Sequence, residues 1–202
     1  MYTFRQDFWI QLLLNLSRYI DMHVANTGHH SEQVAQWARV TGRKMGCADS
    51  EIQATYWAAL LHDIGKIGIP YPVLSKEGPL SRKEWKLMKL HPTIGSNIVQ
   101  TLDSIAHVAP IISTHQEKYD GTGYPLGLRG KQIPTGARIL ALADAYDAIT
   151  NDRFYRKARS HDEAVIELQV NKGTHFDPEI LDIFLDTVNP IWVSHNANVR
   201  VC

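Results

Sequence analysis

Apolar residues recur along the chain at intervals of three and four positions, the spacing of a helix with one buried face. No stretch of any length alternates apolar and polar residues as a half-buried strand does. The pattern therefore predicts an all-α domain, a helical bundle around one core. The expected helices cover residues 4–22, 29–45, 50–64, 81–90, 92–102, 105–117 and 135–151, with two more that begin at Ser160 and Pro178, the last ending near Val188.

Local signals mark several helix starts. Ser81 stands three residues before Glu84, and Ser160 stands three residues before Glu163, which is the spacing of a capping box. Pro92 suits the first turn of the helix that follows His91, because its missing N–H would have no partner there.

Two segments between the predicted helices are rich in glycine and proline. Residues 67–79 are expected to form a connecting loop. Residues 120–134 hold four glycines and two prolines within fifteen positions, which is too long for a plain connector. Loops of this length in compact domains are often functional, so the second segment is a candidate part of a binding site.

Residues 60–66, Leu-Leu-His-Asp-Ile-Gly-Lys, place an imidazole beside a carboxylate where an apolar helix closes. Asp63 follows Tyr56 by seven positions, so it is expected on the buried face, and Gly65 is expected to end the helix. Burying an ionised carboxylate without a partner would cost several kcal/mol, so a metal ion, a basic side chain or a raised pKa must compensate. Taken alone, the pair is better explained by a core histidine and a capping aspartate than by a metal site.

Other helices also direct ligand-type side chains inward. His30, His91 and His115 fall on buried faces or at helix mouths, and Asp144 and Asp147 share one largely apolar face. Two carboxylates three residues apart on a helix repel each other unless a cation intervenes. Separate inward placements of this kind favour a metal site, and nitrogen and oxygen ligands without a thiolate cluster suit iron, manganese or zinc.

Composition narrows the function classes. In 202 residues, Lys+Arg and Asp+Glu each count 21, so no basic field favours binding to a nucleic-acid polymer. The only cysteines, Cys47 and Cys202, are far apart, which indicates a reducing compartment, and we expect a cytoplasmic protein. The apolar run over 10–16 is interrupted by polar residues and is too short for membrane insertion.

The order of the motifs resembles the HD-GYP output domain of bacterial signalling, a branch of the HD superfamily. The motifs are His62-Asp-Ile-Gly-Lys66, His91-Pro92, Asp120-Gly-Thr-Gly-Tyr-Pro125, Asp144-Ala-Tyr-Asp147 and Thr174-His-Phe-Asp-Pro178. The resemblance implies an all-helical phosphodiesterase that hydrolyses cyclic di-GMP to linear pGpG or on to GMP. It places the domain at 26–190, after an N-terminal helix at 1–25 and before a tail at 191–202. Whether that helix docks on the core or forms a homodimer, and whether a sensor domain precedes it in a longer protein, stays open.

Six positions match the metal ligands of the family: His30, His62, Asp63, His91, His115 and Asp144. The resemblance implies that Asp63 bridges two divalent ions, with iron or manganese favoured and zinc or nickel also suited. Two cations about 3.5 to 4 Å apart can lower the pKa of a bridging water and stabilise in-line displacement at phosphorus.

Five further positions match residues around the substrate. Lys66 would meet the scissile phosphate, unless it is merely solvated, and Asp147 would support a metal ligand or carry a proton. Tyr124 would stack on a base or line the entrance. Arg153 and Arg156 would contact phosphate or guanine, unless they are ordinary surface residues.

Two positions depart from the fullest form of the family. Asn26 stands where some members carry a glutamate ligand of a third metal, and Gln116 stands where many members carry a second histidine. A neutral amide is a weaker ligand than carboxylate or imidazole. We therefore expect two ions rather than three, with the second ion held more weakly.

These departures keep other functions open. The chain could stop at pGpG, act slowly, or bind a cyclic dinucleotide as a receptor without cleaving it. Another HD-type phosphohydrolase, acting on nucleoside phosphates or on a hybrid cyclic dinucleotide, is a further alternative. Residues 120–134 argue against nucleoside phosphates, because simple HD phosphatases lack this loop.

Overall fold

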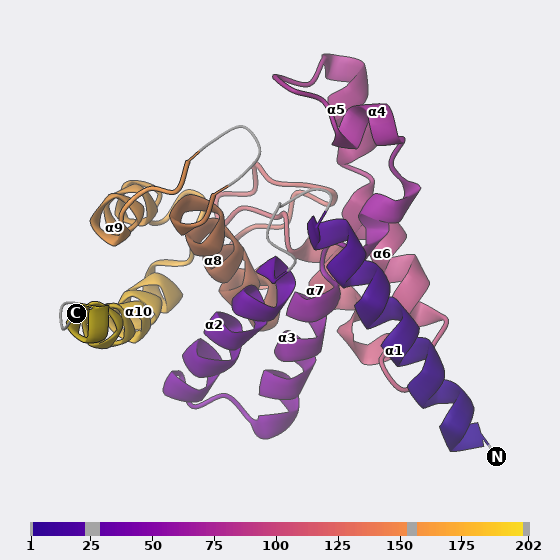
Figure 1. Cartoon of the computed structure of the whole chain (residues 1–202), viewed down its shortest axis with the longest axis horizontal. Coiled ribbons are helices and arrows are strands. Elements are labelled where there is room, and N and C mark those ends of the chain that lie inside the picture. The colour runs from indigo at the N-terminus through magenta and orange to yellow at the C-terminus, as the bar shows by residue number, and fades with distance from the viewer. Residues whose placement is uncertain (1, 23–28, 153–156, 200–202) are drawn as a thin grey trace.

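The computed structural model describes residues 2–22, 29–152 and 157–199, with side chains described from residue 8 to residue 189 outside the same gaps. Within these ranges the chain is helical and holds no strand, only one isolated bridge between Lys172 and Phe176, as the sequence predicted (Figure 1). The elements are α1 (Tyr2–Ile20), α2 (His30–Lys44), α3 (Asp49–Leu61), η2 (Ile64–Gly68), α4 (Tyr71–Leu74), α5 (Arg82–Met88), α6 (His91–Gln100), η3 (Ala106–Val108), α7 (Ala109–Thr114), η4 (Gly130–Gln132), α8 (Thr135–Thr150), α9 (His161–Val170) and α10 (Pro178–Val199).

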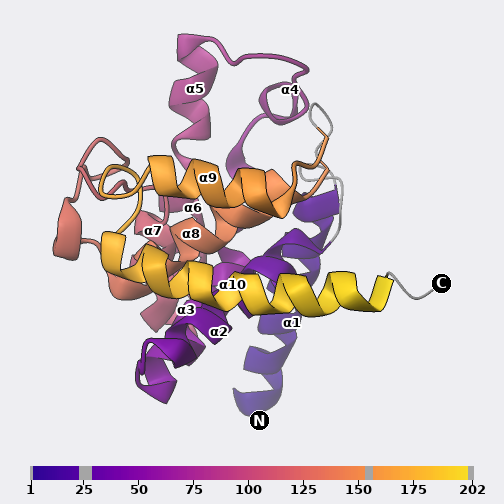
Figure 2. The same ribbon diagram turned by 90° about the vertical axis from the view of Figure 1, so that its left-hand side faces the viewer.

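The centre of the fold is a layer made by α2, α3 and α8, which pack on one another. α6 and α7 cover one side of this layer, and α9 and α10 run side by side across the other (Figures 1 and 2). Side chains from every part of the layer meet in one core, including the fully buried Leu61, Ile112, Leu140, Leu181 and Phe184. Ligand-bearing helices far apart in sequence are thereby held side by side.

The N-terminal helix α1 docks on the core, which was one of the two alternatives kept open for it. It packs against α3 and η2, and three buried hydrogen bonds fix its C-terminal end and the residue that follows it. Ser17 Oγ donates a hydrogen bond to the Leu60 carbonyl at 2.7 Å. Asp21 accepts hydrogen bonds from the backbone N–H of Ser31 at 2.9 Å and from its hydroxyl at 3.0 Å. Pairing with a second copy stays a prediction.

The expected role of Gly65 as the end of the central helix is wrong. α3 ends at Leu61, three residues earlier than predicted, and Gly65 lies inside the short 3-10 helix η2, which packs on α6. A Cβ atom on Gly65 would lie 2.0 Å from the His91 carbonyl oxygen and 2.5 Å from the Gly95 nitrogen. Glycine is required here because two backbones touch, a reason that no local pattern reveals.

Three other boundaries differ from the prediction. Residues 67–79 include the short helix α4 with Pro72 in its first turn, although its proline and glycine content had predicted a loop. The helix expected over 105–117 is divided into η3 and α7, because Pro110 begins a new helix, and it ends at Thr114. α10 continues to Val199 rather than ending near Val188. The predicted capping boxes at Ser81 and Ser160 are both present.

Gly65→Ala should lower the free energy of unfolding by about 3 kcal/mol or more, because the contacting atoms are backbone and cannot rotate away. Gly42→Ala is the matched control. Its Cβ would meet only Ile52 Cγ1 at 3.4 Å, inside a helix where alanine is favoured over glycine by about 0.5–1 kcal/mol. Urea denaturation of the two variants and the wild type measures the difference, and equal stabilities would contradict the contact described.

Candidate metal centre

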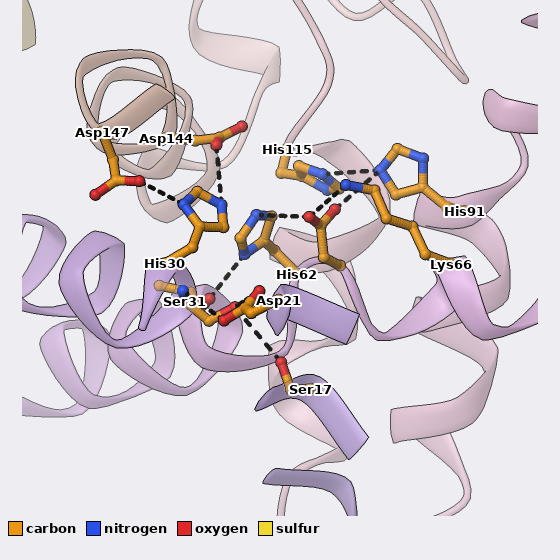
Figure 3. Close-up of polar contacts among 12 residues, drawn as sticks. Ser17, Asp21, His30, Ser31, His62, Lys66, His91, His115, Asp144 and Asp147 are labelled. Carbon is orange, nitrogen blue, oxygen red and sulfur yellow. Dashed lines mark hydrogen bonds and ion pairs between the residues drawn. The ribbon is translucent and has the colours of Figure 1, made fainter. Parts of the chain in front are cut away.

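Six of the predicted ligands converge from α2, α3, η2, α6, α7 and α8 on one buried region (Figure 3). They form two clusters, and within each cluster the candidate ligand atoms all lie within 4.8 Å of one another. The first cluster is His30, His62 and Asp144, and the second is Asp63, His91 and His115. All are buried except Asp144, whose side chain is 27% exposed. Residues separated by more than a hundred positions in the sequence thus share one site.

Three of the four histidines are held in the same way, each just beyond or at the end of a helical turn. Each Nδ1 lies within hydrogen-bond distance of the backbone carbonyl three residues earlier: His62 with Ala59 at 2.8 Å, His91 with Met88 at 2.8 Å and His115 with Ile112 at 2.7 Å. A carbonyl can only accept, so Nδ1 carries the proton and the Nε2 lone pair faces the site.

His91 and His115 bring their Nε2 atoms to 3.2 Å from each other. Burial lowers the pKa of His91 to about 4 and that of His115 to about 3, so both rings are neutral at pH 7. With both protons on Nδ1, two lone pairs face each other and cannot form a hydrogen bond. One divalent ion at about 2.0–2.1 Å from each nitrogen would hold them at such a separation, so the pair fits a metal.

His30 lies between the two carboxylates of α8. Its Nδ1 is 2.6 Å from Asp147 Oδ2, and its Nε2 is 3.3 Å from Asp144 Oδ1. Burial lowers the pKa of His30, but the two carboxylates outweigh burial and raise this pKa to about 10. Burial likewise raises the pKa of Asp144, but His30 and His62 hold that pKa below its usual range. Asn151 Nδ2 donates at 2.8 Å to Asp147 Oδ1, so both Asp147 oxygens have partners.

His62 supplies the clearest test of whether the first cluster fits a metal. Its side chain is 1% exposed, and within the described part of the chain its Nε2 has no hydrogen-bond partner. A buried polar atom without a partner costs about 1–3 kcal/mol, so such atoms are rare in native proteins. The free lone pair of Nε2 beside His30 and Asp144 matches the coordination of a divalent ion.

Asp63 connects the two clusters. Its Oδ2 lies 3.6 Å from His62 Nε2, and its Oδ1 lies 3.7 Å from His91 Nε2. Burial raises the pKa of Asp63, but Lys66 and the surrounding histidines outweigh it and keep this pKa well below its usual value. Lys66 Nζ is 2.5 Å from Asp63 Oδ2, with its side chain 15% exposed. The lysine is therefore an ion-pair partner at the site rather than a freely solvated side chain.

The loop over 120–134 closes against the second cluster. The Tyr124 hydroxyl donates a hydrogen bond to Oε1 of Gln116 at 3.1 Å, and Gln116 directly follows His115 in the chain. Burial, together with the Asp63 and Asp144 carboxylates, raises the pKa of Tyr124, which places the phenol within the field of both clusters. The amide oxygen of Gln116 thus faces the loop.

Sequence reasoning missed the residue that holds this loop. Glu117 is 2% exposed, and its carboxylate accepts hydrogen bonds from the backbone N–H groups of Leu126, Gly127 and Leu128 at 2.6 to 3.1 Å. An acidic residue between a buried histidine and a glycine-rich segment was the only signal available. Sequence reasoning also missed the ion pair of Arg138 with Asp177 at 2.5 Å, which fixes the start of α10 to α8.

Three predicted residues lie outside the described part of the chain: Asn26, Arg153 and Arg156. His29, which precedes the candidate ligand His30, has a side chain that is 82% exposed. None of the described helices is long and apolar enough to cross a membrane.

Comparison with known families and proteins agrees with this geometry. The profile described as HD domain matches residues 15–180. The chain is 38% identical over 189 residues to a protein of Thermotoga maritima named cyclic di-GMP phosphodiesterase, covering 91% of this chain and 50% of that protein. It is 35% identical over 178 residues to 3'3'-cGAMP-specific phosphodiesterase 2 of Vibrio cholerae, covering 87% of this chain and 34% of that protein. The chain therefore spans half or less of these curated relatives.

Two solved structures share the fold. A cyclic GMP-AMP specific phosphodiesterase of Vibrio cholerae aligns with a TM-score of 0.72 at 22% identity, covering 92% of this chain and 50% of that one. A protein of Bdellovibrio bacteriovorus described as HDG"Y"P aligns with a TM-score of 0.63 at 27% identity, covering 80% of this chain and 52% of that one. The predicted all-α fold and the resemblance to HD-GYP domains are confirmed.

The two clusters should differ in how pH affects metal binding. An ion at the first cluster must displace a proton from His30, whose pKa is raised to about 10, so its apparent affinity should rise roughly tenfold per pH unit between about pH 6.5 and 9. His91 and His115 are already neutral there, so the second cluster should show little change. Competition titrations with a chromophoric chelator at two pH values measure both, and equal slopes would contradict the proton placement.

Asp147→Asn should weaken the first ion about tenfold, because the neutral amide no longer supports the His30 ring with a charge. Asp182→Asn is the control, since this exposed carboxylate pairs with Lys172 on the surface. Metal affinity of the two variants, measured by the same titration, should separate them. An unchanged affinity in Asp147→Asn would show that the His30 contact does not support metal binding.

Proposed function

This chain belongs to the HD domain family, and on that premise we propose that it is a metal-dependent phosphodiesterase that hydrolyses cyclic di-GMP to linear pGpG and possibly further to GMP. The observation that carries the proposal is the pair of ligand clusters joined by Asp63. Two relatives at 35% and 38% identity are named as cyclic dinucleotide phosphodiesterases, which supports the substrate class.

His30, His62 and Asp144 would hold one divalent ion, and His91 and His115 the other, with Asp63 between them. When bound, such a pair of ions polarises a phosphodiester oxygen and lowers the pKa of a water for attack at phosphorus. The charge balance supports bound cations, since the three carboxylates of Asp63, Asp144 and Asp147 gather at one site with Lys66 and His30 as their cationic partners.

The chain's own residues would position both the ligands and the substrate. Lys66 supplies an ammonium group beside Asp63, placed to meet a phosphate oxygen that arrives there. Of the two roles expected for Asp147, support of a ligand is favoured over proton transfer to the leaving group, because both of its oxygens already accept hydrogen bonds. Tyr124 would form the substrate-side edge, and Arg153 and Arg156 stay predicted contacts for phosphate or guanine.

Iron or manganese is the metal we favour, with zinc or nickel also compatible with nitrogen and oxygen ligands. The expectation of a weakly held second ion gains support from Gln116, whose amide oxygen accepts the Tyr124 hydroxyl instead of standing free. The count of two rather than three ions depends on Asn26 and stays a prediction. A cytoplasmic location is supported only by the low cysteine count, and a homodimer or an attached sensor domain stays a prediction.

A hybrid cyclic dinucleotide is the second candidate substrate, because one relative at 35% identity is named as specific for 3'3'-cGAMP. The receptor alternative receives less support. A pocket that only binds has no need for a buried His62 Nε2 without a partner, or for two facing histidine lone pairs.

Purified protein reconstituted with manganese or ferrous iron should convert cyclic di-GMP to a linear product, and EDTA should abolish the reaction. Asp63→Ala should lower kcat/KM by about three orders of magnitude or more, because it removes the carboxylate shared by both clusters. Asp103→Ala, which removes an exposed carboxylate, is the control. Chromatography of the products also separates pGpG from GMP and cyclic di-GMP from 3'3'-cGAMP cleavage. Intact binding without a linear product under any metal would contradict the hydrolase proposal and favour the receptor.

A further inference from the structure

The arm formed by α4 and α5 projects from the bundle (Figures 1 and 2). α5 has no buried residue, although it carries Trp85 and Leu87, which are 46% and 39% exposed. A half-exposed tryptophan on a helix that adds nothing to the core is unlike the usual use of this residue. What the Trp85 ring contacts therefore indicates what the arm does.

Trp85 faces the loop that closes the metal centre. Its ring meets the Tyr124 ring edge to face, with centroids 6.3 Å apart and planes at 72°. Lys89, one helical turn after Trp85, places Nζ 5.0 Å from the Tyr124 ring centroid and 6.0 Å from that of Trp85. Two aromatic rings and one ammonium group thus form a cluster from two segments about forty residues apart.

The charge of Lys89 is not neutralised locally. No carboxylate in the described part of the chain forms an ion pair with it. The acidic residue of the same helix, Glu84, is taken up by Lys76 at 2.6 Å and by the backbone N–H of Ser81 at 2.7 Å. An ammonium group held against two rings, with no acid beside it, is available to an anionic ligand.

Both sides of this cluster are attached to the second metal-ligand cluster. The Met88 carbonyl, next to Lys89, accepts the hydrogen bond that orients His91. Gln116, next to His115, accepts the Tyr124 hydroxyl. The two histidines themselves lie 3.2 Å apart between their Nε2 atoms. The aromatic and cationic cluster is therefore connected, through residues next to each of its two segments, to both histidines of the second metal-ligand cluster.

We propose that Trp85 and Lys89, together with Tyr124, form a wall that binds the half of the cyclic dinucleotide remote from the cleaved phosphate. The inference rests on the proposed function and specifies how its substrate is held. A base stacks on the exposed face of Trp85, and the second phosphate lies near Lys89.

The chemistry of the substrate fits this wall in both its parts. A cyclic dinucleotide carries two bases and two phosphodiesters, so while one phosphate occupies the metal centre the other stays outside it. Aromatic side chains stack on bases of any identity, and a lysine adds affinity for the phosphate. The wall would thus favour dinucleotides over single phosphodiesters without choosing between guanine and adenine.

The test compares Trp85→Ala, Trp85→Phe and the control Leu87→Ala, which removes another exposed apolar side chain of α5. In metal-loaded protein, Trp85→Ala should raise the Kd for a cleavage-resistant phosphorothioate analogue of cyclic di-GMP about tenfold, within the range for loss of one stacked base. Trp85→Phe should restore most of the affinity, and Leu87→Ala should bind like the wild type. For bis(p-nitrophenyl) phosphate, which has one phosphodiester and no second phosphate, Trp85→Ala should lower kcat/KM by much less than tenfold, and Leu87→Ala should leave it unchanged.

The outcomes separate this inference from the proposed function. The wall is refuted if Trp85→Ala binds the analogue as the wild type does. It is also refuted if this variant loses bis(p-nitrophenyl) phosphate turnover by the same factor as it loses affinity for the analogue. Both results leave the phosphodiesterase proposal untouched. If the variant binds more weakly but the wild type makes no linear product, the wall holds and hydrolysis fails. If the wild type does not bind the analogue, both are refuted.

Discussion

The structure depends on the compensation of buried charge at Asp63. A carboxylate at 7% exposure among buried imidazoles is stable only if cations offset its desolvation. Lys66, three residues after Asp63, supplies one cation. The two ligand clusters on either side would hold metal ions that supply the others. The apolar core holds α2, α6, α7 and α8 around α3 so that each contributes one or more groups that face this carboxylate or its neighbours.

Three ligand histidines share one solution to the problem of orientation. Each places Nδ1 at hydrogen-bond distance from the carbonyl three residues earlier, so the backbone fixes Nδ1 as the protonated nitrogen and leaves Nε2 to face the site. Carbonyls at the end of a helical turn would otherwise lack partners, and the partial negative charge there favours cations nearby. His30 is the exception, since it lies at the start of α2 and takes its orientation from Asp147 on another helix. The first cluster is therefore the one whose geometry depends on tertiary contact.

Periodicity predicted most of the helices and the inward placement of side chains such as His30 and Asp144, whereas the full set of metal ligands came from the resemblance to HD-GYP domains and stays a prediction. A histidine or aspartate at an apolar position, such as His30 or Asp144, is visible without knowing its partners. Features set by contacts between distant segments were missed or misread. Gly65 was read as a helix end, when it is required by the backbone of His91, and Glu117 was passed over because the N–H groups it binds lie nine to eleven residues later. The contact between Trp85 and Tyr124 joins segments about forty residues apart, so no local pattern could reveal it.

The attachment of α1 has a mechanical consequence. Ser17 holds the residue two positions before His62, and Asp21 holds the residue directly after His30, so one helix grips the chain beside a ligand in each of two elements (Figure 3). These two histidines belong to the same cluster. α1 therefore cannot move relative to one of these two segments without breaking or straining its hydrogen bond to the other. α1 thus links the two chain segments that carry the histidines of the first cluster.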